Sequence, residues 1–280
     1  MNRLALALLP AVFAACSNSN SPNPVPVEPP GAGAVSRVDL RSALGLATIE
    51  PVGVTVMPDT GELYLLDAEA GVYRLEAGPN GQSFFRRVFT ADELEIQVDP
   101  DSPFTDLAAM GDGTFAITAR NDGFLLDLAD GSIQQHFCYV PSIIIGPNPG
   151  VGVEQLTTSC AFDVVNQRIL AQPQTFFDGA LIQSELGTFP ITGGDGTDWH
   201  PMPSRTFIAG GMTVDESAVI WLGQADELYQ YDLSTDELMF VRSLDEFGIQ
   251  WVRGLCFRGD HLIVLDGVAG EMVWIPLARL

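Results

Sequence analysis

A four-residue motif recurs five times in this chain and constrains its fold more than any other feature. Each copy has a small or short polar residue, a larger apolar residue, a small residue and usually another apolar one. A turn and two further strand-like runs follow every copy. Successive copies begin 53, 53, 52 and 43 residues apart, at Gly53, Asp106, Ser159, Gly211 and Gly254.

Such a period, built from short strands, is typical of a β-propeller. A fourth strand is visible in three repeats and obscure in the third, and the fifth repeat ends after its third strand at 272–276. The segment 36–40 is an unassigned strand that could complete this last sheet and leave no exposed edges. We therefore predict an all-β fold, a five-bladed β-propeller closed by an N-terminal strand.

Two other architectures stay open at this stage. A six-bladed propeller would need irregular strands within 139–157 and 187–205, which are long enough to hold them. A β-sandwich is the third alternative. No amphipathic helix is evident from Ser36 onward.

The N-terminal residues predict a leader and a tether. Arg3 precedes an apolar run that is too short to span a bilayer, so 1–15 is predicted to be a signal peptide. The end of this run and Cys16 resemble a bacterial lipobox, which implies lipidation of Cys16 and, through Ser17, sorting to the outer membrane. Residues 16–35 are rich in Pro, Ser and Asn and predict an extended tether, with the propeller over 36–280.

The charge balance excludes one class of partner. The chain has 36 acidic residues, 13 basic residues that are all arginine, and a formal net charge of −23. Such a chain lacks the basic surface that nucleic acid binding requires. We expect a monomer that is anchored to the membrane by lipid and binds an envelope protein or a small molecule.

Two segments carry a family resemblance. Residues 61–67, and residues 260–266 together with 270–274, resemble bacterial propellers with NHL, YVTN, PQQ-like or gluconolactonase-like repeats. The resemblance covers nearly all of 36–280 and implies the fold more than an activity. It also implies that a calcium-dependent lactonase is a candidate, with Glu50 as the matching glutamate.

Ligands of propellers usually bind where loops enter the innermost strands. In this chain those loops contain Glu50, Gln155, Trp251 and Arg253, of which the last two combine a large ring with a forked cation. A glycine-rich segment before Trp199 and His200 adds these two residues as candidate ligand contacts. No catalytic residue is predicted, because three histidines in separate segments form no recognisable triad.

Two acidic clusters could supply oxygen ligands to a calcium ion. Their residues are Asp99, Asp101 and Asp106 in one cluster and Asp195 and Asp198 in the other. Solvated turns are the favoured interpretation of both clusters. A Cys138–Cys160 disulfide is a further alternative for an oxidising compartment, although outer and inner strands usually lie too far apart for it.

These observations favour a non-enzymatic, membrane-anchored propeller that binds or scaffolds a protein or a small ligand. A calcium-dependent, lactonase-like hydrolase is the alternative function. A dehydrogenase with a quinone cofactor is third, because such propellers usually have longer chains.

Overall fold

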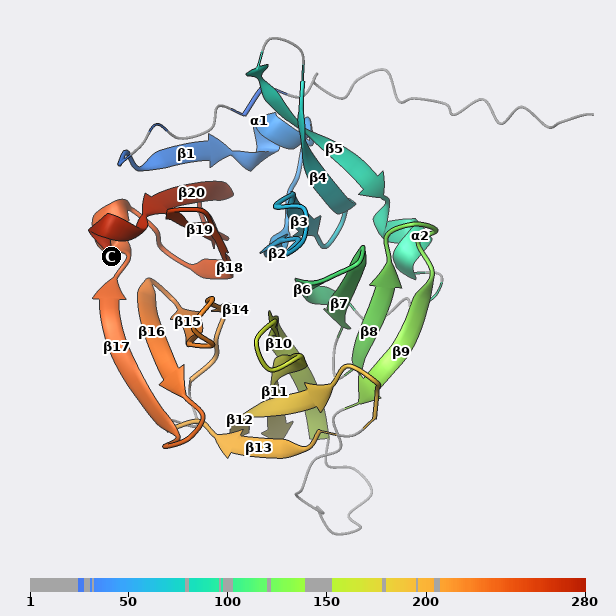
Figure 1. Ribbon diagram of the computed structural model, residues 1–280, viewed down its shortest axis with the longest axis vertical. Coiled ribbons are helices and arrows are strands. Elements are labelled where there is room, and N and C mark those ends of the chain that lie inside the picture. The colour runs from blue at the N-terminus through green and yellow to red at the C-terminus, as the bar shows by residue number, and fades with distance from the viewer. Residues whose placement is uncertain are drawn as a thin grey trace, which may run out of the picture.

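The computed structural model describes residues 25–27, 31, 33–78, 81–95, 97, 103–119, 122–138, 153–177, 180–194, 196–203 and 207–280. Within them, five four-stranded antiparallel sheets surround a central axis, which confirms the five-bladed β-propeller (Figure 1). The six-bladed alternative is wrong, because the described part of 187–205 completes the third sheet instead of forming another.

Each of the first four sheets begins with its innermost strand and continues outward in chain order. The first blade consists of β2 (Pro51–Val56), β3 (Leu63–Asp67), β4 (Gly71–Ala77) and β5 (Ser83–Phe89), and the second of β6 (Phe104–Gly111), β7 (Thr114–Ala119), β8 (Asp122–Asp127) and β9 (Ile133–Cys138). The third blade consists of β10 (Val153–Asp163), β11 (Arg168–Phe177), β12 (Ala180–Pro190) and β13 (Asp198–Pro201), and the fourth of β14 (Gly211–Val214), β15 (Ile220–Gln224), β16 (Glu227–Asp232) and β17 (Glu237–Ser243).

The fifth blade joins the two ends of the folded body. Its strands are β18 (Val252–Arg258), β19 (His261–Asp266), β20 (Glu271–Pro276) and, outermost, β1 (Ser36–Asp39). In the antiparallel register Ser36 pairs with Trp274 and Val38 with Met272, and Figure 1 shows β1 beside β20. The predicted closure by an N-terminal strand is therefore confirmed.

Short helices occupy connections where we expected none. They are α1 (Leu40–Leu44) and α2 (Ala91–Glu95), with 3₁₀ turns η2 (Asp245–Phe247) and η3 (Leu277–Arg279). The predicted strand at 36–40 ends one residue early, because the Asp39 side chain accepts a hydrogen bond from Arg41 N and caps α1. Five-residue helices are too short to show a helical period in the sequence.

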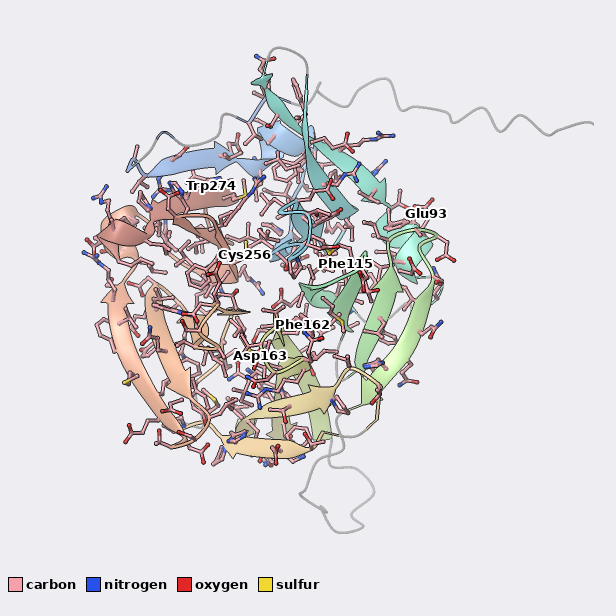
Figure 2. All side chains as sticks on the ribbon, in the orientation of Figure 1. Glu93, Phe115, Phe162, Asp163, Cys256 and Trp274 are labelled. Atoms are coloured by element: carbon pink, nitrogen blue, oxygen red, sulfur yellow. The ribbon has the colours of Figure 1, made fainter. Side chains whose placement is uncertain are left out.

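The hydrophobic core is divided among the five junctions between blades. Each junction holds one cluster of buried side chains, and the faces of each sheet pack on the sheets before and after it. Between the first two blades, for example, the Tyr64 and Phe115 rings meet edge to face with centroids 4.8 Å apart. Phe115 is labelled in Figure 2. No single blade could bury its apolar residues alone.

The first residue of four of the five motif copies lies against the next blade. A Cβ atom on Gly211 would lie 2.7 Å from the Cα atom of Gly254, and one on Gly53 would lie 2.7 Å from Leu107 N. At the second junction Asp106 Oδ2 accepts a hydrogen bond from Cys160 N at 2.9 Å. The recurring small residue is thus the position where backbones of adjacent innermost strands come together.

Buried polar side chains join the third blade to the fourth. The Gln172 side chain donates to Phe207 O at 3.2 Å and accepts from Ala209 N at 2.8 Å. Ser184 Oγ also donates to Phe207 O, at 2.9 Å. These bonds fix the segment that leads into β14, because buried amide and hydroxyl groups are costly to leave unpaired.

Part of the predicted tether lies against the propeller. Val27 is 2% exposed, donates its backbone N–H to Ser83 O and packs in the cluster between the fifth and first blades. Val25 N donates to Ser42 O, while the Val25 side chain is 49% exposed. The chain therefore approaches the body along the outer edge of the first blade.

Candidate functional site

The central channel has two ends with different chemistry. We call the end where β2, β6, β10, β14 and β18 begin the entry end, and the end where they finish the exit end. The close backbone contacts at the first motif residues lie between the two ends. The sequence predicted ligand contacts at the entry end.

At the entry end, buried aspartates hold the loops that carry two of the predicted residues, Glu50 and Trp251. Asp67 accepts hydrogen bonds from the backbone N–H groups of 50, 69 and 70, and Asp266 accepts from those of 250, 251, 268 and 269. Burial raises the pKa of Asp67, partly offset by these amide hydrogen bonds. Neither aspartate was predicted as a site residue. Each ends the second strand of its blade, β3 or β19, within a segment that resembles the bacterial propeller repeats.

Three predicted contacts lie at the entry end and face solvent. Glu50 and Arg253 are exposed, and Trp251 is 45% exposed. Val268, in the loop held by Asp266, is 62% exposed. Arg253 forms no ion pair with any carboxylate of the described residues. Gln155 lies near the start of β10, where it pairs with Thr175 of β11. These residues therefore lie at or near the start of innermost strands β2, β10 and β18.

Trp199 and His200 lie far from the axis. We expected a loop, but both belong to β13, the outermost strand of the third blade, where His200 pairs with Leu186. The Trp199 ring packs edge to face on Phe189 at 5.5 Å, and His200 Nδ1 lies 2.7 Å from Asp236 Oδ1. The strand was missed because it has four residues and no alternation of apolar and polar side chains.

The predicted calcium ligands are not brought together where the structure describes them. Asp99, Asp101 and Asp195 lie outside the described residues, and Asp198 is exposed at the start of β13. Asp106 is buried, and its two oxygens accept hydrogen bonds from Leu107 N and Cys160 N. Both Asp106 oxygens are therefore already engaged by backbone amides, and the described residues contain no cluster of three metal-binding side chains.

The cysteines of the innermost strands carry free, buried thiols. The alternative of a Cys138–Cys160 disulfide is wrong, because Cys160 is a free thiol. Cys160 lies on innermost β10, whereas Cys138 lies on outermost β9. Burial raises the pKa of the thiols of Cys160 and Cys256, most strongly through loss of solvation. Both thiols are therefore protonated at neutral pH and poor nucleophiles.

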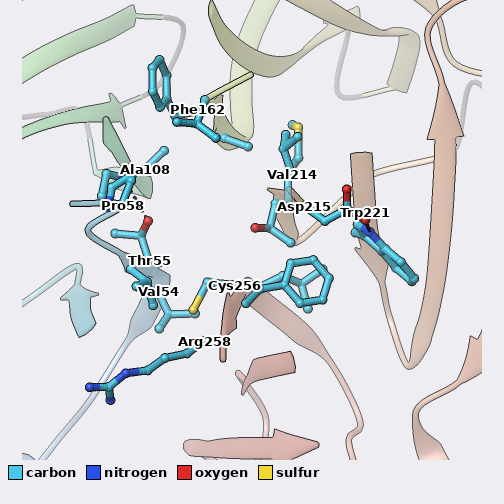
Figure 3. Close-up of a pocket in the computed structure, with 18 of the residues that line it drawn as sticks. Val54, Thr55, Pro58, Ala108, Phe162, Val214, Asp215, Trp221, Cys256 and Arg258 are labelled. Carbon is cyan, nitrogen blue, oxygen red and sulfur yellow. Dashed lines mark hydrogen bonds between the residues drawn. The ribbon is translucent and has the colours of Figure 1, made fainter. Parts of the chain in front are cut away.

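A cavity of about 880 Å³ opens at the exit end of the channel. Its wall is made by the second to fourth residues of all five motif copies and by the turns that follow them (Figure 3). The third residue of every copy is small, which leaves the space open. These third residues are Thr55, Ala108, Ala161, Thr213 and Cys256.

Aromatic and acidic groups stand on one side of this cavity. The Trp221 and Phe257 rings meet edge to face at 5.6 Å, and Trp221 Nε1 donates a hydrogen bond to Asp215 Oδ2 at 2.9 Å. Glu216 follows in the same turn and is exposed. This site was not predicted from the sequence, because ligand contacts were expected at the opposite end of the innermost strands.

Comparisons with known proteins support the fold alone. No family model and no curated protein matches the chain. A Bacteroides thetaiotaomicron protein of unknown function is similar in structure, with a TM-score of 0.51 and 13% identity over 79% of this chain and 57% of that chain. An extracellular domain of a hybrid two-component system from the same organism gives 0.45 and 11% over 80% and 27%. The chain thus spans between about a quarter and three-fifths of these proteins.

No helix among the described residues is long and apolar enough to cross a bilayer. Residues 1–24, which include the predicted leader and Cys16, lie outside the described residues.

Buried Asp106 should make the free energy of unfolding depend on pH. Loss of solvation raises its pKa well above the ordinary 3.8, so the unfolded chain releases this proton at lower pH than the native protein does. Protonation of Asp106 therefore contributes to the free energy of unfolding. This contribution is fully present below about pH 4 and is lost as pH rises through the native pKa of Asp106. We expect Asp106→Asn to be less stable than wild type by about 1 kcal/mol at acid pH, through one weakened hydrogen bond, and to regain this deficit toward neutral pH.

Urea unfolding at several pH values measures the difference. Asp198→Asn, at an exposed position, controls for the loss of one negative charge. A difference between Asp106→Asn and wild type that stays constant with pH would contradict the account.

Proposed function

We propose that this chain is a membrane-tethered, non-enzymatic propeller that binds an apolar small molecule in the exit cavity. The observation that carries the proposal is the cavity itself. Its volume of about 880 Å³ falls within the range of about 300–1,000 Å³ that ligand pockets usually have. Five innermost strands contribute the wall, so the site is rigid and formed before the ligand arrives.

The chemistry of the wall supports binding rather than catalysis. Most side chains around the cavity are apolar, and its two thiols are kept protonated by burial. The hydroxyl of Thr55 already accepts a hydrogen bond from Ala109 N at 2.9 Å. Asp215 accepts from the N–H groups of Ser217 and Val219 as well as from Trp221. These groups hold the wall in shape and form no paired nucleophile and base.

A probe of the cavity tests the proposal. Diphenylhexatriene is neutral, apolar and fluorescent when it leaves water, and we expect the wild-type protein to bind it. Val214 is half-buried on the cavity wall, so Val214→Trp should fill part of the space and weaken binding by about tenfold or more.

Val268→Trp makes the same change at the opposite end, where Val268 is 62% exposed, and should leave probe affinity within about twofold. Thermal unfolding establishes that both variants are folded. Weaker binding in Val268→Trp alone would move the site to the entry end, and undiminished binding in Val214→Trp would remove the exit cavity as the site.

The tether forms the second part of the proposal. The lipobox resemblance at Cys16 and the serine that follows favour a lipid anchor in the outer membrane, facing either side of it. Since Val27 is docked on the first blade, the free length from Cys16 is roughly 30 Å, at about 3.1 Å per extended residue. Such a short tether would keep the propeller near the membrane surface.

Mass spectrometry of protein extracted from membranes tests the anchor. We expect a mature chain that begins at Cys16 and carries acyl chains, and a Cys16→Ser variant that no longer fractionates with the membrane. An unmodified Cys16 in membrane-extracted wild type would refute this part of the proposal and leave ligand binding untouched.

A further inference from the structure

We infer that the ligand of the exit cavity is an organic cation, an apolar body that carries a quaternary ammonium group. This inference rests on the proposed function and specifies the chemistry of its ligand. It follows from the charges at the cavity, from two aromatic walls and from the hydrogen bonds already made there.

The charged groups at the cavity favour a cation. The charged side chains that line the cavity are Asp215, Glu216 and Arg258. The Arg258 guanidinium lies over the Trp274 ring at 5.6 Å, and Figure 3 shows its side chain directed away from the opening. The two carboxylates therefore dominate the field at this wall, and they favour a positively charged ligand.

Aromatic walls are the second step. Trp221 and Phe257 are both half-buried, and their ring planes meet at 75° with centroids 5.6 Å apart. Both residues line the cavity, so the pair places aromatic rings beside its two carboxylates. A cation near such ring faces is attracted by their quadrupoles, which is how aromatic cages bind quaternary ammonium groups.

Hydrogen bonding is the third step and narrows the kind of cation. The oxygens of Asp215 already accept from two backbone amides at 2.8 and 3.0 Å and from the Trp221 indole at 2.9 Å. Asp215 is therefore fixed in place and has little capacity left for a ligand that must donate several hydrogen bonds. A quaternary ammonium group donates none, so it receives the full electrostatic attraction without needing a free acceptor.

Three probes with one apolar body test the inference. They are neutral diphenylhexatriene, its trimethylammonium derivative and its propionic acid derivative, each titrated at about 0.15 M salt so that distant charges are screened. We expect the wild-type protein to bind the cation about tenfold or more tightly than the anion, with the neutral probe between them.

Variants separate the local site from the general charge of the protein. Trp221→Leu should lose about fivefold or more in affinity for the cationic probe and keep its affinity for the neutral one within about twofold. Trp221→Phe keeps a ring and should retain the preference, which guards against misfolding of the leucine variant. Glu216→Gln should weaken cation binding, whereas Glu237→Gln, the same change at an exposed position on outer strand β17, should not.

The outcomes distinguish this inference from the function on which it rests. Equal affinities for all three probes would overturn the cationic ligand and leave the apolar cavity as a binding site. Equal losses in Glu216→Gln and Glu237→Gln would also overturn it, because the preference would then come from net charge. If none of the probes binds, the proposed function falls as well.

Discussion

The structure depends on the close approach of neighbouring innermost strands around the axis. At Gly211 and Gly53, an added Cβ atom would lie 2.7 Å from backbone of the next blade, which leaves no room for a side chain. At the second junction the Asp106 carboxylate replaces this contact with a hydrogen bond to Cys160 N. Close packing or a hydrogen bond at the first motif residue therefore joins neighbouring blades at these junctions.

This contact also explains why the two ends of the channel differ. Small first residues draw the backbones together, and the larger second and fourth residues pack into the junctions between blades. The small third residues then leave space near the exit end, where the cavity of about 880 Å³ opens. One sequence pattern thus supplies both the tight ring and the apolar wall, and the loops add aromatic and acidic groups to that wall.

Much of the fold could be predicted from the sequence, because repetition survives wherever packing is the same in each blade. The five innermost strands and the closing strand 36–39 follow from spacing and from a missing strand. Strand β13 could not be found, since Asp198–Pro201 has neither length nor alternation, and its pairing with Leu186 depends on tertiary contacts.

The candidate site was predicted less well than the fold. Ligand contacts were predicted at the entry end because propellers usually bind ligands there, and Glu50, Trp251 and Arg253 do lie at that end. The end that opens into a cavity is decided by distances between backbones of different blades, which a single sequence does not contain. The signal that was present is the small third residue of each motif copy.

Equilibrium unfolding of Gly211→Ala tests the central claim most directly. The added methyl group would meet the Gly254 backbone at 2.7 Å, so the innermost strands would have to separate. We predict a loss of about 1–3 kcal/mol in the free energy of unfolding. Gly31→Ala, at an exposed glycine with no atom within 4 Å of the added carbon, should change it by less than about 0.5 kcal/mol. A Gly211→Ala protein as stable as wild type would show that the blades are not held at this contact.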